Sequence, residues 1–581
     1  MADSAGGQMP PGMQAMFVAG QAMAQGFFDT LARQHAALLD SSGAAAPRLP
    51  MPETEALATI HKTYAEKHAA LWSSMLAHES GAAAEAVVSP EPGDRRFAAP
   101  EWSASPLFDY LRQAYLLNAG LLREMAEAMP IADSRARSRL RFLTRQYTDA
   151  LAPSNFAATN PEFIKTALET KGESIARGIH NLLADLEKGR ISMTDDAAFE
   201  VGRNLALTPG AVVFENELIQ LIQYAPLTDK VAQKPLLIVP PCINKFYVMD
   251  LQAENSLVRF IVEQGFTVFL VSWKNPRPDS GGHHTWDDYL DKGPLAALEV
   301  VRAVTRVEKP HALGFCVGGT LLASALGVAR ARGEEPVSSL TLMTTLLDFS
   351  EAGELGCLVD EASLAAREAA IGKGGVLKGQ ELANVFSFLR ANDLVWQYVV
   401  GNYLKGGTPP AFDLLYWNSD PTNLPGPFLV WYLRNMYLEN NLRVPGKLKM
   451  LGQKVDLGKL DMPTYLMAAR EDHIVPWKGA YLGRGLLGGE TTFVLGASGH
   501  IAGAINPASK NRRSFWTADV DAADPDEWLG AAVEHKGSWW LHWIEWLQAR
   551  SGRKIAARGR LGSTKYEPIE PAPGRYVKER A

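Results

Sequence analysis

One cysteine is placed by its neighbours to act as a nucleophile. Cys316 stands in the segment Gly314-Phe-Cys-Val-Gly-Gly319, after a short apolar stretch and directly before a helical pattern over 321–332. That order predicts a strand, a sharp turn and a helix, with glycines where a Cβ would collide with neighbouring elements. Backbone N–H groups and the dipole at the start of a helix favour an anion such as a thiolate. On these residues alone, a small buried side chain in a tight turn remains the competing interpretation.

Two later segments supply an acid and a base. Residues 463–470 read as a strand that is followed by Glu471-Asp-His473, and residues 491–495 read as the next strand, followed by Gly496-Ala-Ser-Gly-His500. The chain order of nucleophile, acid and histidine, with the last two at the ends of successive strands, is that of the α/β-hydrolases. We therefore predict a triad in which Cys316 is the nucleophile, His500 the general base and Asp472 the residue that orients it.

Backbone N–H groups that could stabilise a tetrahedral oxyanion are predicted at two places. One is Val317, the residue after the nucleophile, and the other is the loop Pro240-Pro-Cys-Ile-Asn-Lys245 after a buried strand at 236–239. In that loop the candidates are Cys242 and Ile243. The side chain of Cys242 is interpreted as a packed thiol that contributes only its backbone.

From about residue 198 the chain alternates strands and helices, which predicts a mainly parallel α/β sheet in a domain over 198–581. We expect an antiparallel hairpin over 211–224 and core strands at 266–273 and 340–345. The alternation stops between about 346 and 445, and we interpret this aromatic-rich stretch as a cap that excludes water and shapes an acyl pocket. A tryptophan-rich helix after His500 should pack in the core, and the tail after Lys554 is predicted to be partly disordered.

Residues 1–197 lack strand alternation and predict a mainly helical N-terminal domain. Apolar residues from Met13 to Leu38 recur at three- and four-residue spacing, and packing on another helix is favoured over a surface or partner role. A second helix is expected over 53–79. Ser105-Pro106 and Asn160-Pro161 are helix starts, the latter for a helix that ends near residue 188. His35, His61, His68 and His78 are scattered along polar helices, and we expect them to be surface histidines and not a metal site.

Composition limits the class of protein. The chain has 581 residues and a formal net charge of −6, and this acidic balance argues against nucleic acid as the main partner. It has only three cysteines, which argues against a disulfide framework. The N-terminus has no cationic stretch followed by an apolar core, and no run approaches the roughly 20 apolar residues of a transmembrane helix. We therefore expect a soluble or at most peripheral cytoplasmic protein without a transmembrane segment.

Taken together, several segments resemble the polyhydroxyalkanoate synthases, in particular the long single-subunit class I enzymes. The resemblance covers most of the chain and is weak over the first hundred residues. It implies an α/β-hydrolase core with a cap, preceded by the helical domain, and it places Cys316, Asp472 and His500 at the family's nucleophile, acid and base. The segments that carry it are Arg95-Arg-Phe97, Phe108-Asp-Tyr-Leu-Arg-Gln-Ala-Tyr115, Pro240-Pro-Cys-Ile-Asn-Lys245, Gly314-Phe-Cys-Val-Gly-Gly319, Arg470-Glu-Asp-His-Ile-Val-Pro-Trp477, Gly496-Ala-Ser-Gly-His-Ile-Ala-Gly503 and Glu570-Pro-Ala-Pro-Gly-Arg-Tyr-Val-Lys578.

The resemblance implies polymerisation of (R)-3-hydroxyacyl-CoA, such as short-chain 3-hydroxybutyryl-CoA, with release of CoA. It also implies a homodimer attached to the growing polyester granule. We expect no metal and no cofactor, since the CoA that is released comes from the substrate. Arg390 in the cap is a candidate for a substrate phosphate, and Ala502, two residues after His500, is expected near the pocket.

Two other functions stay open on the sequence. A thioesterase or small-molecule acyltransferase of the same fold would release a free acid or a single-unit product. A noncatalytic granule-coat or scaffold protein would tolerate loss of Cys316. Within the favoured function, direct assistance of hydroxyl deprotonation is an alternative role for Asp472.

Overall fold

The structure is a computed structural model that describes residues 52–79 and 85–581. The described residues divide into two compact units, of which the first comprises those up to Met193 together with Ser387–Pro410 and the second comprises Thr194–Phe386 with Ala411–Ala581. Residues 387–410 belong to the stretch expected as a cap. The apolar stripe from Met13 to Leu38, and His35 with it, lies outside the described residues. Within the described ranges, no helix is long and apolar enough to cross a membrane.

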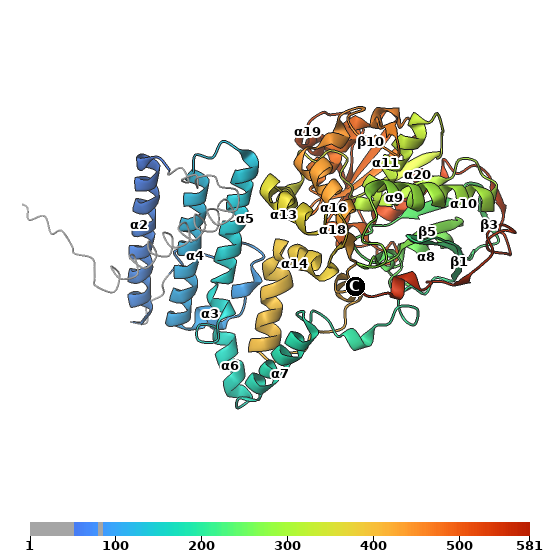
Figure 1. Ribbon diagram of the computed structural model, residues 1–581. Helices are drawn as coiled ribbons and strands as arrows, with labels where there is room; N and C mark the ends of the chain where they lie inside the picture. The colour runs from blue at the N-terminus through green and yellow to red at the C-terminus, as the bar shows by residue number, and fades with distance from the viewer. Residues whose placement is uncertain (1–51, 80–84) are drawn as a thin grey trace, which may run out of the picture. The chain divides into compact units, whose positions relative to one another are not determined.

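The first unit is helical in its described part (Figure 1). Ser105 and Pro106 start α4 as predicted, and Asn160 caps α6 by accepting a hydrogen bond from the Phe163 N–H at 3.0 Å. The single helix expected from residue 161 to 188 is wrong, because Gly172 adopts a left-handed φ of 88° and separates α6 from α7. The elements are α2 (Thr54–Glu79), α3 (Glu101–Ala104), α4 (Pro106–Ala128), α5 (Ser134–Ala150), α6 (Pro161–Glu169), α7 (Glu173–Lys188), η6 (Asn392–Trp396) and η7 (Val399–Leu404).

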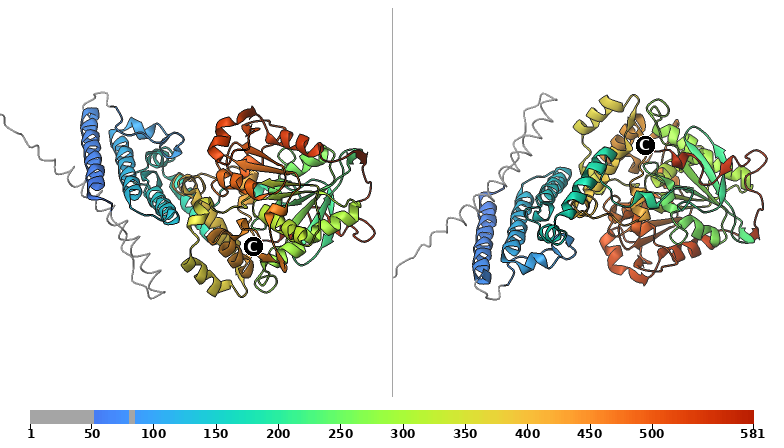
Figure 2. Two further views of the ribbon diagram at one scale, coloured as in Figure 1. Left: turned by 90° about the horizontal axis from the view of Figure 1, so that it is seen from above. Right: turned by 90° about the horizontal axis from the view of Figure 1, so that it is seen from below.

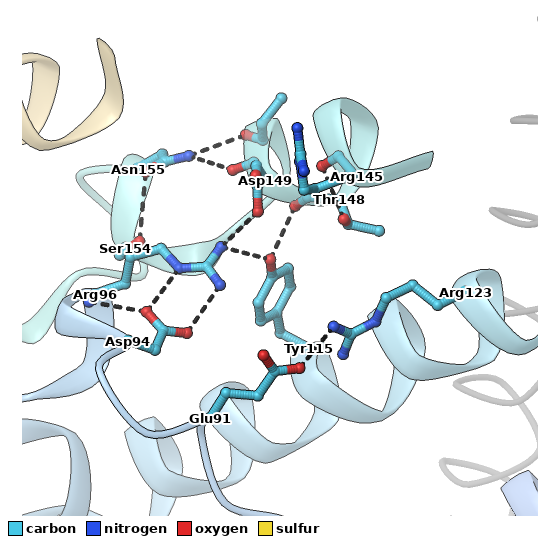
Figure 3. Close-up of polar contacts among 11 residues, drawn as sticks. Glu91, Asp94, Arg96, Tyr115, Arg123, Arg145, Thr148, Asp149, Ser154 and Asn155 are labelled. Atoms are coloured by element: carbon cyan, nitrogen blue, oxygen red, sulfur yellow. Dashed lines mark hydrogen bonds and ion pairs between the residues drawn. The ribbon is translucent and has the colours of Figure 1, made fainter. Parts of the chain in front are cut away.

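A partly buried arginine joins the segment before α4 to α4 and α5 (Figure 3). The Arg96 guanidinium lies 2.8 Å from Asp94 Oδ2 and 3.1 Å from Asp149 Oδ1, and it donates to the Tyr115 hydroxyl at 2.9 Å. A buried cation is tolerated only when it is paired and hydrogen-bonded in this way. The cluster therefore fixes the two helices relative to each other.

His68 on α2 corrects one sequence interpretation. It was expected at the surface, but only 5% of it is exposed, and its ring lies 4.5 Å from that of Tyr64. Burial lowers the pKa of His68, so the neutral imidazole packs as an ordinary core ring.

The second unit is built on an 11-stranded sheet in the order β15-β14-β13-β12-β7-β6-β4-β5-β2-β1-β17. Its middle strands, from β13 to β5, run parallel, and the strands on both flanks are antiparallel. Helices lie on both sides of the sheet (Figure 2), so the middle strands are buried on both faces and read as continuous apolar runs. The predicted core strands and the β1–β2 hairpin are confirmed. The strands are β1 (Gly210–Glu215), β2 (Ile219–Tyr224), β3 (Lys230–Ala232), β4 (Leu236–Val239), β5 (Val268–Trp273), β6 (His311–Phe315), β7 (Ser339–Met343), β12 (Thr464–Ala469), β13 (Thr491–Gly496), β14 (Ser514–Thr517), β15 (Val533–Lys536), β16 (Lys554–Ala556) and β17 (Glu570–Pro571).

Helices of two kinds belong to this unit. The helices outside the segment between β7 and β12 are α8 (Leu257–Glu263), α9 (Trp286–Leu290), α10 (Ala296–Thr305), α11 (Val317–Ala331), α17 (Trp477–Leu482), α18 (His500–Ala504), α19 (Pro525–Ala531) and α20 (Trp539–Gln548). Those inserted between β7 and β12 include α12 (Gly353–Cys357), α13 (Glu361–Ile371), α14 (Gly379–Leu389), α15 (Asp413–Asn418), α16 (Gly426–Tyr432) and η8 (Leu433–Leu438), with the short strands β8 (Val376–Leu377), β9 (Leu424–Pro425), β10 (Lys449–Met450) and β11 (Gln453–Lys454).

The tryptophan helix α20 packs in the core, as predicted. Trp539, Trp540 and Trp543 are at most 1% exposed, and the Trp543 indole donates to the Thr341 hydroxyl on β7 at 3.0 Å. Trp546 is only partly buried.

The C-terminal tail is ordered, which contradicts the prediction of partial disorder. β16 pairs with β3, β17 pairs with β1, and the short helix η12 (Tyr576–Lys578) buries Tyr576 and Val577. Charged residues of the tail form ion pairs, since Arg575 contacts both Glu215 and Glu570. Composition predicts that these charges are solvated, whereas Arg575 pairs with Glu215, which lies far away in the sequence, as well as with the nearby Glu570.

Candidate active site

Cys316 occupies a strained turn between β6 and α11. Its φ is 54° and its ψ −129°, a backbone conformation that a residue with a side chain rarely adopts. Close backbone approach explains the glycines around it. A Cβ on Gly314 would lie 2.4 Å from Gly319 Cα, and a Cβ on Gly318 would lie 2.4 Å from the Val239 carbonyl oxygen. The sharp turn predicted from the sequence is therefore present.

The elbow holds the Cys316 side chain at the first turn of α11. Its N–H donates to the Met343 carbonyl on β7 at 2.9 Å, and its own carbonyl accepts from the Thr345 hydroxyl at 3.2 Å. The side chain is 8% exposed and lines a cavity.

We expect Gly318→Ala to disrupt this elbow. The added methyl would meet the carbonyl oxygens of Val239 and Pro240 at 2.4 and 2.5 Å, and neither is a flexible side-chain end. Overpacking of this kind costs about 1–3 kcal/mol, and here it would also push away the loop after β4. The melting temperature should therefore fall below that of the parent protein. Gly485→Ala is the matched control, because nothing lies within 4 Å of its added Cβ; equal effects of the two substitutions would contradict the prediction.

The structure brings the predicted acid and base together at the ends of β12 and β13. His500 Nδ1 lies 2.6 Å from Asp472 Oδ2. The other carboxylate oxygen, Oδ1, accepts hydrogen bonds from the N–H groups of Ile474 and Val475, each at 2.8 Å. With both oxygens occupied and its side chain fully buried, Asp472 can hold only one orientation.

The charge on His500 depends on both neighbours. Burial lowers the pKa of His500, but the Asp472 carboxylate and the Cys316 thiolate outweigh burial and raise that pKa to about 10. Hydrogen bonds from His500 to both side chains act in the same direction. His500 thus lies between an acid and a thiol, and the protonated form of its imidazole is favoured there.

Two of the three candidate oxyanion residues, Val317 and Ile243, line the same cavity as Cys316. Val317 is the first residue of α11, so its N–H has no acceptor within the helix. Ile243, on the loop after β4, lines the cavity together with Val317 and Cys316. Cys242 is 1% exposed, and burial raises the pKa of its thiol well above the usual value. Its side chain is therefore a packed thiol.

A largely apolar cavity of about 240 Å³ extends from Cys316 among the helices inserted between β7 and β12. Its polar lining includes Tyr432 and Tyr437, which the sequence did not single out. Burial, and then Cys316, raise the pKa of Tyr437, so its hydroxyl stays protonated. Further lining residues come from α12, α13, α14 and α16 and include Leu355, Leu364, Arg367, Leu382, Phe386 and Leu429.

The two residues predicted to bind substrate, Arg390 and Ala502, do not line the cavity beside Cys316. Arg390 belongs to the first unit, where its guanidinium pairs with Asp393 at 2.8 Å, and it is not among the residues that line the cavity. Ala502 lies on α18, its carbonyl accepts from Arg513, and it does not line the cavity either. Their roles in substrate binding stay predictions.

Comparisons with known proteins agree with this architecture. Residues 93–261 match the family model described as "Poly-beta-hydroxybutyrate polymerase (PhaC) N-terminus", and residues 235–507 match "alpha/beta hydrolase fold". The chain is 53% identical to the poly(3-hydroxyalkanoate) polymerase subunit PhaC of Cupriavidus necator, over 90% of this chain and 89% of that protein. It is 42% identical to the poly(3-hydroxyalkanoate) polymerase of Methylorubrum extorquens, over 89% and 86%. Among solved structures, a monoacylglycerol lipase of Paleococcus ferrophilus is similar with a TM-score of 0.34 and 14% identity, over 57% of this chain and 99% of that one.

Proposed function

Because the chain belongs to the poly(3-hydroxyalkanoate) polymerase family, we propose that this enzyme, an acyltransferase, joins (R)-3-hydroxyacyl-CoA units into a polyester and releases CoA. The observation that carries the proposal is the alignment of Cys316, His500 and Asp472 beside an apolar cavity. Short-chain units such as 3-hydroxybutyryl-CoA are the proposed substrates.

The first step transfers the acyl group to the enzyme. The Cys316 thiolate attacks the thioester carbonyl of the substrate, a new C–S bond forms, the bond to the CoA sulfur breaks, and His500 supplies the proton that CoA takes. The developing oxyanion is stabilised by the N–H groups of Val317 and of Cys242 or Ile243. One thioester is exchanged for another, so the acyl group stays activated for the next transfer; a serine ester would lie lower in energy.

The second step builds the polymer. The 3-hydroxyl of an incoming 3-hydroxyacyl-CoA attacks the Cys316 thioester, a C–O bond forms, the C–S bond breaks, and His500 accepts the hydroxyl proton. The product is a longer acyl-CoA, which acylates Cys316 again and releases one CoA for each unit added.

Acylation itself prepares His500 for the second step. The thiolate of Cys316 is one of the charges that raise the pKa of His500, and a neutral thioester removes it. Burial, which lowers that pKa, then opposes Asp472 alone. The fraction of neutral imidazole rises, and a neutral imidazole is the form that can accept the hydroxyl proton.

The helical unit is proposed to contact a second copy or the polyester granule in the cytoplasm. Its helix α7 leaves Ile179, Leu183 and Leu186 at 55%, 55% and 68% exposed, an unusual apolar content for a surface in water. No cofactor or metal is required by the proposed steps, since CoA arrives with the substrate.

Incubation of the purified protein with (R)-3-hydroxybutyryl-CoA tests this function. We expect continued release of free CoA together with insoluble polyester, in a ratio of one CoA to one unit. CoA release with free 3-hydroxybutyrate as the only acyl product would instead identify a thioesterase. No CoA release, with binding to preformed granules intact, would identify a noncatalytic granule protein.

A further inference from the structure

A lysine is buried at the end of the loop that carries the candidate oxyanion donors Cys242 and Ile243, of which Ile243 lines the cavity. Lys245 closes the segment Pro240–Lys245 after β4, and only 2% of it is exposed. Burial lowers the pKa of the Lys245 ammonium, which Asp420 and Glu579 partly oppose. Because a buried ammonium is tolerated only when it is hydrogen-bonded or paired, the partners of Lys245 show what this lysine holds in place.

The ammonium binds the end of the chain. Lys245 Nζ donates a hydrogen bond to the Glu579 carbonyl oxygen, and the next carbonyl, that of Arg580, accepts from Asn275 Nδ2 at 2.9 Å. The tail is anchored just before this point, where Tyr576 is buried and its hydroxyl donates to the Asn216 carbonyl at 2.9 Å. Lys245 therefore joins the loop to a segment that the sheet already holds in place.

A second segment holds the same loop from another part of the chain. Trp417 Nε1 donates to the Lys245 carbonyl at 2.7 Å, and the Thr422 N–H donates to the Ile243 carbonyl at 3.3 Å. Asn275 completes the connection, because its Oδ1 accepts from the Asn423 N–H at 2.9 Å. The loop is thus fixed by residues 417–423 through its backbone and by the C-terminal tail through the Lys245 side chain.

We propose that Lys245 is a positioning residue whose bond to the C-terminal tail sets the Ile243 donor for the oxyanion. Oxyanion donors must point at a charge that exists only in the transition state, so a small displacement costs rate without weakening substrate binding. Ile243 is two residues from Lys245, and Asn244 between them forms an antiparallel β-bridge with Pro421, so a shift of Lys245 is passed on along a short, paired segment. The C-terminal residues then contribute to catalysis indirectly. They contact no reacting atom, but they hold the loop that carries Ile243.

Lys245→Met tests the proposal with a side chain of similar length that cannot donate to Glu579. Removing an oxyanion donor outright costs about 10²–10³ in kcat, and we expect displacement to cost roughly 10- to 100-fold. The fall should appear equally in kcat and kcat/KM, because the lost interaction belongs to the transition state. Rates are expressed per active site, counted from the initial burst of CoA, and Lys245→Arg should recover part of the loss.

Lys274→Met is the matched control. The Lys274 ammonium lies 5.0 Å from the centre of the Tyr576 ring, so this lysine also contacts the tail, but it is not part of the loop. We expect its kcat to stay within about twofold of the parent, as for surface substitutions. A Lys245→Met enzyme with parental kcat per site would overturn the proposal, even with a lower melting temperature, because Lys245 would then only stabilise. A raised KM at unchanged kcat would overturn it too.

If Lys245→Met does not fold, Asn275→Ala tests the same connection between the tail and the loop, since it leaves Lys245 in place but frees both the Arg580 carbonyl and the Asn423 N–H. It should lower kcat per site at unchanged KM, and a parental kcat would count against the proposal. The inference rests on the proposed thioester chemistry, and the two can fail separately. A parent enzyme that releases no CoA would contradict the function, whereas parental rates in the variants would contradict the role of Lys245.

Discussion

Cys316→Ala is expected to abolish CoA release and polymer formation while leaving the fold intact. The substitution removes one sulfur atom from a largely buried side chain and leaves the backbone of the elbow unchanged, so little stability is lost. Without the nucleophile no acyl-enzyme forms, and losses of about 10⁴-fold or more are usual when a member of a catalytic triad is removed. The measurement is CoA released per mole of protein, with mass spectrometry of the peptide that contains residue 316.

Cys357→Ala is the control for loss of a buried thiol. Cys357 is 2% exposed, and its Sγ donates to the Glu354 carbonyl at 2.9 Å. We expect this variant to keep most of the parental activity. If the Cys316 variant turned over near the parental rate, the assignment of the nucleophile would be wrong.

The inactive variant also reports on His500 without any need for activity. Burial lowers the pKa of His500, Asp472 and Cys316 raise it, and the balance lies at about 10. Alanine removes both the charge and the hydrogen bond of Cys316, so the pKa of His500 should fall. NMR titration of the imidazole can follow this change. An unchanged pKa would mean that the two side chains do not interact in solution.

The grouping of Cys316, Asp472 and His500 could be anticipated because each follows a local signal. Glycines mark the elbow, and the ends of parallel strands meet at one edge of a sheet, so strand order alone brings the acid and the histidine close to the cysteine. The structure adds the second set of contacts on Asp472, namely the N–H groups of Ile474 and Val475, which no motif announces.

Other features depend on partners that are distant in the sequence. The sequence shows Lys245 only as part of a motif, because its hydrogen-bond acceptor, the Glu579 carbonyl, lies more than 300 residues later. Tyr432 and Tyr437 were two of several tyrosines in an irregular stretch until folding placed them beside Cys316. The prediction of a partly disordered tail rests on composition, and composition cannot predict that β17 pairs with β1.

Asp472→Asn should separate the two half-reactions. Acylation starts from a thiol that is partly ionised even without help and is intrinsically very nucleophilic. Elongation must deprotonate a secondary alcohol, a far weaker acid, and therefore needs a base in the correct tautomer. We expect roughly one CoA released per active site, an acyl adduct on the Cys316 peptide and almost no polymer. Quenched-flow counting of CoA and mass spectrometry of the peptide measure both.

The contacts of Asp472 explain why asparagine gives the wrong tautomer. Its Oδ1 position accepts from two backbone N–H groups, so an asparagine must place its carbonyl oxygen there. The amide NH₂ then occupies the Oδ2 position and donates to His500 Nδ1, where the carboxylate had accepted a bond at 2.6 Å. The imidazole proton is forced onto Nε2, the nitrogen that has to receive the hydroxyl proton.

A wrong tautomer of this kind lowers turnover by about 10⁴ in serine proteases, and we expect a similar loss in the elongation step. Asp472→Ala is the comparison, because it removes the carboxylate without imposing a tautomer. His500 can then carry its proton on either nitrogen, so Asp472→Ala should elongate faster than Asp472→Asn although it has lost more of the side chain. Equal slowing of both steps in Asp472→Asn, with no adduct, would show that Asp472 supports the first transfer as much as the second and would contradict this division.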